Sequence, residues 1–431
     1  MEMPKIYVNP PRSEWPALTA RCTRQEEEIG ERVAAILTEV RTGGDAALRR
    51  IVRRIEGYLP ETFEVTRERR AEAAKAVSPQ LKAALEQAKA NIEAFHRSQL
   101  PAQVEVETMP GVRCVQRAVA IGRAGLYIPG GKAPLFSTVL MLALPARIAG
   151  CREVILCTPC GRDGRIAPEI LYAADLCGVD RVFALGGAQA VAAMAYGTES
   201  IPRVDKIFGP GNRYVTKAKQ LAGAADVAVD LPAGPSEVLV LADEDARPEF
   251  AAADLLSQAE HGDDSQAMLV CRSEEFARRA IASVGEQAMR LSRRDAIGNS
   301  LANSRIVVFS DPDEQIAFAD AYAPEHLIVA MRDAWDAAAR ITAAGSVFIG
   351  GYSPESAGDY ASGTNHTLPT GGWARAYSGV NTESFMRKIT YQELTRGGLE
   401  ALAPTITAMA EAEGLDAHAN AVRIRTEGGA R

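Results

Sequence analysis

From about residue 115 onward, short apolar runs alternate with longer stretches of helical pattern. Continuous apolar runs typical of buried strands occur at residues 153–158, 181–185, 204–208, 237–242, 266–271, 305–309, 326–330 and 346–349. Helix-forming composition fills the segments between them, such as 167–177, 188–196 and 250–261. Strands that alternate with helices predict parallel sheets with helices on both faces, an α/β fold. So many strands favour two sheets.

The two ends of the chain have a different pattern. Residues 25–41 and 79–97 are predicted as amphipathic helices, and the pattern after Gly379 turns helical again over 404–412 and 420–424. This last stretch is too short for a core of its own, so we expect it to pack on the main body or on another subunit. The expected division is an N-terminal segment (1–24), a first Rossmann-like domain (25–126 with 237–379), a second one (127–236) and a C-terminal segment (380–431).

Composition and charge exclude several classes of protein. Hydrophobic residues make up 47% and charged residues 24%, as in folded, water-soluble chains, and the net charge of -7 argues against a nucleic-acid partner. The longest apolar stretch, 137–150, is shorter than a membrane helix and contains Pro145. The start of the chain lacks a secretory pattern, and seven cysteines are an odd number for a disulfide framework. We expect a cytoplasmic protein that does not enter a membrane.

The histidines indicate where chemistry takes place. Only five occur, and His261 follows Gln258 by three residues near the end of a predicted helix. This spacing can direct an amide oxygen and an imidazole toward one metal ion. The alternative is a histidine favoured by the dipole at a helix C-terminus, with Gly262 ending the helix.

Two further segments combine acids with histidines. Glu325 and His326 stand together at the start of an apolar strand, as a general acid/base pair or as a surface pair that caps the strand. The Gly-rich stretch 353–372 contains Asp359 and His366, and the C-terminal segment contains Glu413 and His418. The set Gln258, His261, Asp359 and His418 offers two nitrogens and two oxygens, which suits zinc, with manganese or cobalt as substitutes.

Glycine-rich turns suggest where an anion could bind. No GxGxxG motif occurs, but the segments 209–220 (GPGNRYVTKAKQ) and 122–138 each join a strand to a helix through glycines. Either is a site for a phosphate at a helix N-terminus or simply a tight turn. The CxxC pair Cys157 and Cys160 has no second pair to complete a zinc site, and we interpret it as structural.

Together these segments resemble histidinol dehydrogenase, through nearly the whole chain. The resemblance rests on GLYIPGGKAPLFSTVLMLALPARIAGC, GGAQAVAAMAYGTESIPRVDKIFGPGN, DLPAGPSEVLVLAD, DLLSQAEHGDDSQ, APEHL, SPESAGDYASGTNHTLPT and GLDAHANAV. It implies a homodimer with one zinc ion per subunit, which oxidises L-histidinol to L-histidine through bound L-histidinal, consumes two NAD per turnover and completes histidine biosynthesis. The family also exchanges C-terminal segments across the dimer, which implies active sites shared between subunits.

The resemblance assigns roles by position. It implies Gln258, His261, Asp359 and His418 as zinc ligands and Glu325 and His326 as the catalytic pair. The substrate site that it implies contains Ser236, Gln258, His261, His326, Asp359, His366, Glu413 and His418. The NAD contacts that it implies are Tyr127, Gln189 and Asn212. Two departures, Cys160 for the usual proline and Ala419 for a frequent lysine, fall on no implied ligand.

The reaction agrees with these residues, and alternatives remain open. An alcohol that becomes an acid loses four electrons, so two hydride transfers and one water addition are needed. We expect His326 to take the hydroxyl proton and Glu325 to activate water. A covalent intermediate on Cys151 or Cys114 is disfavoured by their apolar surroundings. The alternatives are a diverged relative that oxidises another amino alcohol or diol, a zinc hydrolase, or a two-domain binding protein.

Overall fold

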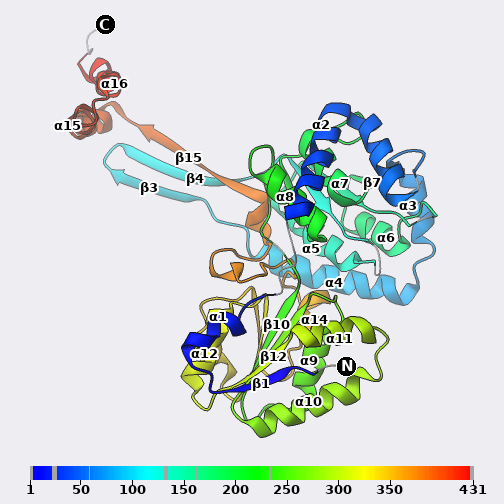
Figure 1. Cartoon of the computed structure of the whole chain (residues 1–431). Coiled ribbons are helices and arrows are strands. Elements are labelled where there is room, and N and C mark those ends of the chain that lie inside the picture. The colour runs from blue at the N-terminus through cyan, green and yellow to red at the C-terminus, as the bar shows by residue number, and fades with distance from the viewer. Residues whose placement is uncertain are drawn as a thin grey trace.

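Two six-stranded sheets and a projecting arm make up the molecule (Figure 1). The computed structural model describes residues 3–21, 27–57, 59–130, 134–161, 163–232 and 234–427. Residues 25 and 26 of the first predicted helix, and Cys22, lie outside the described residues. In the described part of the chain, no helix combines the length and the apolar character needed to cross a membrane.

Sheet 1 is entirely parallel. Its strands, in spatial order, are β1 (Lys5–Val8), β12 (Arg305–Val308), β11 (Gln266–Cys271), β10 (Glu237–Ala242), β13 (His326–Ala330) and β14 (Ser346–Ile349). One face is covered by α9 (Pro248–Ala259), α10 (Glu274–Ala288) and α11 (Arg294–Asn303). The other face is covered by α1 (Trp15–Leu18), α12 (Pro312–Tyr322) and α13 (Ala334–Ala338). Because both faces are buried, the central strands are apolar after their first residue, which is the pattern that predicted them.

Sheet 2 has the same layered construction. Its order is β2 (Glu64–Val65), β7 (Arg181–Ala184), β6 (Glu153–Thr158), β5 (Arg123–Tyr127), β8 (Lys206–Phe208) and β9 (Ala228–Val229), with β2 alone antiparallel. One face packs against α2 (Glu27–Glu56), α7 (Gly187–Tyr196) and α8 (Arg213–Gly223). The other packs against α4 (Pro79–Arg97), α5 (Phe136–Ala149) and α6 (Pro168–Leu176), with α3 (Arg67–Ala74) beside α6. The predicted fold class, two parallel-sheet units with helices on both faces, is confirmed.

The sheets divide the chain differently from the expected boundaries. The described part of residues 25–126, which we assigned to the first domain, does not join sheet 1. Its helices and strands belong with sheet 2, because α2 packs on α7 and β2 pairs with β7, except for the two strands at 104–109 and 112–120, which form part of the arm. The N-terminal segment contributes β1 to sheet 1. Sequence patterns gave no sign of either contact, since both join elements that are far apart in the chain.

The arm is a three-stranded antiparallel ribbon with two helices at its end. Its strands are β3 (Val104–Met109), β4 (Val112–Ala120) and β15 (Met386–Leu394), followed by α15 (Arg396–Ala412) and α16 (Asp416–Thr426). Figure 1 shows the arm extending away from both sheets, with the C-terminus near its tip. The two helices contain the predicted segments 404–412 and 420–424, whereas the pattern after Gly379 had not predicted β15.

Candidate active site

The predicted catalytic pair lies at the amino end of a central strand of sheet 1. His326 is the first residue of β13, where it faces Val238 of β10 and Ser346 of β14 in the ladder. Both Glu325 and His326 are buried, and Glu325 Oε2 accepts a hydrogen bond from the backbone N–H of Glu237 at 2.9 Å. A buried carboxyl group and imidazole at a strand end are therefore held in place by the sheet itself.

The two nitrogens of His326 have different surroundings. Nδ1 lies 3.3 Å from the Glu237 carbonyl oxygen, 3.6 Å from Glu325 Oε2 and 3.7 Å from Glu355 Oε1. Since all three are acceptors, the neutral ring keeps its proton on Nδ1. Nε2 lies 3.5 Å from Asp359 Oδ1 and has no hydrogen-bond partner among the residues that the structure describes. Nε2 is thus the nitrogen available to accept a proton.

Protonation in this cluster is strongly coupled. Burial lowers the pKa of His326, but the carboxyl groups of Glu355, Glu325 and Asp359 outweigh it and raise the pKa to about 10. Burial raises the pKa of Glu325 and of Glu355 to about 8. A buried negative charge is costly unless a positive charge accompanies it, and here protonated His326 is the positive charge that the three carboxyl groups surround.

Next to this pair, side chains of the types that can bind a metal ion converge. One ligand atom each from His261, Glu355 and Asp359 lies within 4.8 Å of the others. Glu355 and Asp359 are four residues apart on the short helix α14 (Glu355–Tyr360), which places them on one face. The N–H of His261 donates to the Gln258 carbonyl at 3.2 Å, so His261 continues the last turn of α9.

The fully buried Gln258 side chain tests whether a metal fits here. Neither Oε1 nor Nε2 of its amide has a hydrogen-bond partner in the described part of the chain, and an unpaired buried amide is costly. A metal ion would satisfy the oxygen, and a donor set of nitrogen and oxygen atoms suits zinc. Both carboxylate oxygens of the buried Glu355 likewise lack a hydrogen-bond partner among the described residues, although Oε1 lies 3.7 Å from His326 Nδ1. The residues present therefore fit a metal of this kind.

Two other residues that we predicted for the substrate site, His366 and Ser236, lie at the same edge of sheet 1 as this cluster. The ring of His366 is 2.8 Å from the Asp359 carbonyl oxygen through Nδ1 and 3.3 Å from Thr138 Oγ1 through Nε2. Since Thr138 belongs to α5, this contact connects the site to the helices of sheet 2. Ser236 is half-buried immediately before β10, where its carbonyl oxygen accepts from the Gln266 N–H at 3.2 Å.

Glu413 and His418 are not brought to this cluster by their own chain. Glu413 caps α15 and His418 lies on α16, and both side chains are exposed. The helices that carry them stand at the tip of the arm, away from sheet 1 (Figure 1). Within one chain, the predicted ligand set is therefore incomplete.

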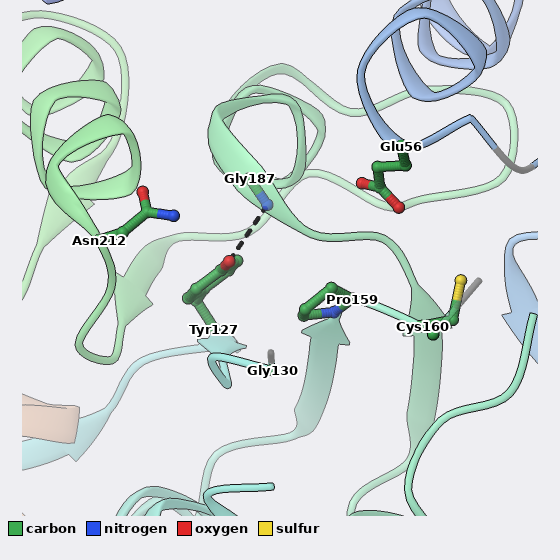
Figure 2. A pocket seen from close by; sticks show the side chains of 8 residues that line it. Glu56, Tyr127, Gly130, Pro159, Cys160, Gly187 and Asn212 are labelled. Atoms are coloured by element: carbon green, nitrogen blue, oxygen red, sulfur yellow. Dashed lines mark hydrogen bonds between the residues drawn. The ribbon is translucent and has the colours of Figure 1, made fainter. Parts of the chain in front are cut away.

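The predicted NAD contacts lie at the carboxyl end of sheet 2. A pocket there is lined by Glu56, Tyr127, Gly130, Pro159, Cys160, Gly161, Gly187 and Asn212 (Figure 2). The Gly187 N–H donates to the Tyr127 hydroxyl at 3.1 Å, and burial raises the pKa of that hydroxyl to about 12. Asn212 caps α8 by accepting from the N–H groups of Tyr214 and Val215. Gln189 is buried behind the pocket and donates to Glu56 Oε1 at 3.1 Å.

Close packing alone requires a glycine at the start of the GPGN turn (residues 209–212). Gly209 has φ +117°, and a Cβ at this position would lie 2.1 Å from the Tyr127 carbonyl oxygen. Only glycine fits such an approach. The turn delivers Asn212 to the start of α8, so the N-termini of α7 and α8 both border the pocket.

Cys151 does not provide a nucleophile. Burial raises the pKa of the Cys151 thiol to about 11, so it is not ionised at neutral pH. Cys157 is fully buried in β6, in keeping with a structural role, while Cys160 lines the pocket of sheet 2.

Sequence reasoning missed two residues that the structure places in these sites. Glu355 carried a signal, because it precedes Asp359 by one helical turn. Glu56 carried none, because its position at the pocket depends on the packing of α2 against α7.

Comparisons with known proteins agree over the length of the chain. The family model for histidinol dehydrogenase matches residues 19–426. Histidinol dehydrogenase of Bacteroides fragilis (strain YCH46) is 55% identical over 427 residues, 98% of this chain and 99% of the relative. That of Xylella fastidiosa (strain 9a5c) is 54% identical over 396 residues, 92% of each chain. The crystal structure of histidinol dehydrogenase from Elizabethkingia anophelis has a TM-score of 0.97 at 47% identity, covering 99% of both chains. The chain therefore belongs to the histidinol dehydrogenase family of oxidoreductases.

Proposed function

We propose that the protein oxidises L-histidinol to L-histidine through bound L-histidinal, in the cytoplasm, as the last step of histidine biosynthesis. It uses one zinc ion per subunit and consumes two NAD per turnover. The observation that carries this proposal is the cluster of His261, Glu355 and Asp359 beside the buried pair Glu325 and His326. This is the constellation that a metal-assisted oxidation needs, in a chain of the matching family.

The metal would be held by side chains from two elements of one subunit and from the arm of another. Gln258 and His261 at the end of α9 and Asp359 on α14 supply three ligands. His418 of the partner subunit supplies the fourth, since its own chain holds it away from the cluster. When bound, zinc polarises the alcohol oxygen, and each NAD accepts one hydride.

Proton transfers belong to the catalytic pair. In the neutral form of His326, which a cation held by Asp359 favours, Nε2 accepts the hydroxyl proton in the first oxidation, because Nδ1 is turned toward acceptors and keeps its own proton. Glu325 removes a proton from the water that adds to the aldehyde, directly or through His326, whose ring lies 3.6 Å away. Loss of two hydrides and three protons, with addition of one water, then accounts for the conversion of a primary alcohol to a carboxylate.

The remaining residues bind and orient the substrate. Ser236 and His366 stand at the edge of sheet 1 near the cluster. Glu413 of the partner subunit offers a carboxylate for the ammonium group of the amino alcohol, as a charge-assisted hydrogen bond. Tyr127, Gln189 and Asn212 serve the NAD site at the carboxyl edge of sheet 2.

The test is NAD reduction at 340 nm with L-histidinol, before and after metal removal. We expect a chelator to abolish the reaction and zinc to restore it. Full activity in metal-free protein would contradict the metal assignment. A panel of other amino alcohols and diols identifies a diverged relative, and hydrolysis without absorbance change would identify a zinc hydrolase.

A further inference from the structure

The pocket of sheet 2 lies where a dinucleotide is expected to bind an open parallel sheet. From β5 the chain builds β6 and β7 on one side and then β8 and β9 on the other, so the strand order reverses between β5 and β8. Ligands of such sheets bind outside the carboxyl ends of the strands at this reversal. Tyr127 ends β5 and Asn212 follows β8, so the two pocket residues flank the reversal point.

An acidic side chain, Glu56, lies in this pocket beside the residues that follow β6. In dinucleotide-binding sheets, an acid after the strand next to the reversal strand binds the hydroxyls of the adenosine ribose. Here that strand is β6, and the residues that follow it are Pro159, Cys160 and Gly161, none of them acidic. Glu56, from the end of α2, places a carboxylate beside them, and Figure 2 shows it pointing into the pocket near Cys160 and Gly187.

The surroundings of Glu56 prepare it to accept a hydrogen bond. The Gln189 amide donates to Oε1 at 3.1 Å and fixes the orientation of the carboxylate. Burial raises the pKa of Glu56, and the Gln189 amide opposes this shift. Burial also raises the pKa of the neighbouring Cys160, so the thiol adds no charge. Among the described residues that line the pocket, Glu56 is the one charged side chain.

We propose that Glu56 binds the 2′-hydroxyl of the adenosine ribose of NAD and thereby selects NAD over NADP, an assignment that rests on the proposed use of a nicotinamide cofactor. A carboxylate accepts a hydrogen bond from the 2′-hydroxyl of NAD. It repels the 2′-phosphate of NADP, which carries negative charge at the same atom. The specificity is therefore carried by α2, outside the strand-turn-helix unit that usually carries it.

Calorimetric titration tests this without depending on turnover. The ligands are NAD, NADP and 2′-deoxy-NAD, which lacks the adenosine 2′-hydroxyl. The proteins are the wild type, Glu56→Gln and Glu31→Gln, a matched control on the exposed side of α2. We expect the wild type to bind NAD at least about 100-fold more tightly than NADP, and 2′-deoxy-NAD about tenfold more weakly than NAD. In Glu56→Gln the ratio of the affinity for NAD to that for NADP should fall to about tenfold or less, while Glu31→Gln should behave as the wild type.

Each outcome bears on the assignment. Equal affinity of the wild type for NAD and 2′-deoxy-NAD overturns it without the need for any variant. An unchanged NAD preference in Glu56→Gln with a normal melting temperature overturns it as well. If the wild type still reduces NAD with histidinol in either case, only the role of Glu56 is lost. A wild type that binds no NAD and reduces none with histidinol overturns both this role and the proposed function.

Discussion

At the scale of single residues, His326 shows how neighbours decide the charge of a buried group. Its imidazole lies within 3.7 Å of carboxyl groups from Glu325, Glu355 and Asp359. Burial alone would keep the ring neutral, yet these groups raise its pKa to about 10. A cation held by Asp359 would weaken that effect, so the charge of His326 depends on the occupancy of the metal site.

Replacement of His326 separates proton transfer from metal binding. We expect His326→Ala to lower kcat for histidinol oxidation by about 100-fold or more, the scale of a lost general base. Zinc content, measured by atomic absorption, should stay at one ion per subunit because Nε2 is 3.5 Å from Asp359 and outside the proposed ligand set. Loss of zinc in this variant would make His326 a ligand instead.

Asp254 provides a test of pH dependence at one buried acid. Burial raises its pKa to about 7, so the folded protein binds this proton more tightly than the unfolded chain. The stabilisation from this group is complete below the unfolded pKa, at about pH 4, and disappears as the pH rises through about 7. Relative to the wild type, Asp254→Asn should therefore gain stability between pH 4 and 8, by up to about 4 kcal/mol.

The measurement is denaturant unfolding of the metal-free wild type and Asp254→Asn at several pH values. The difference between the two proteins reports Asp254 together with its effect on the pKa of the nearby Glu355. Parallel stability curves across this range would show that Asp254 is not shifted.

At the scale of elements, strands buried on both faces are the ones that sequence predicted. β6, β10, β11 and β13 have the predicted bounds, because each is a mainly apolar run between two covered faces. β14 also has the predicted bounds, although it is an edge strand with Val347 exposed. The strands of the arm have no such run. β3 and β15 are almost wholly exposed, so no apolar period marks them, and their pairing with β4 is visible only in three dimensions.

The candidate site divides in a similar way. Local features of the site could be predicted from the sequence. They are the three-residue spacing of Gln258 and His261 and the adjacency of Glu325 and His326. Their meeting with Asp359 requires the ends of α9 and α14 and the start of β13 to come together, which depends on tertiary packing. Glu56 depends wholly on such packing, since α2 is remote in sequence from the strands of its pocket.

The base of the arm is held by an aromatic contact that can be tested. Phe385 is fully buried immediately before β15 and stacks on Phe208 of β8 with ring centroids 3.9 Å apart. We expect Phe385→Ala to lower the free energy of unfolding by about 3–5 kcal/mol, the usual cost of removing a buried phenylalanine ring. Tyr391→Ala, an exposed position on the same ribbon, should cost less than about 1 kcal/mol.

Denaturant unfolding of both variants compares them directly. Equal losses from the two substitutions would mean that the stacked pair does not anchor the arm.

At the scale of the whole molecule, the arm carries site residues away from the site. Glu413 and His418 sit at its tip, where Met409, Leu415 and Ile424 are also exposed. Exposed apolar side chains beside potential metal ligands indicate that this surface packs against another subunit. A homodimer in which each arm completes the partner's site accounts for both features.

Mixing two inactive variants tests the exchange. Neither His418→Ala nor His261→Ala should oxidise histidinol alone, because each lacks a proposed ligand. If arms cross over, a mixed dimer collects both lesions in one site and leaves the other intact, so activity returns to about half of the wild-type value per mixed dimer. If the arm serves its own subunit, every site keeps one lesion and the mixture stays inactive.

The pairing of β1 with β12 has a consequence for the protein while it is being made. Lys5 of β1 pairs with Arg305, so the two partners are separated by 300 residues of chain. At the usual pace of synthesis, about 5–20 residues per second, β1 exists for about 15–60 s before its partner does. All strands of sheet 2 are synthesised within that interval. β1 leaves the ribosome before the other described strands but is among the last of them to be paired, and it stays open to competing contacts until then.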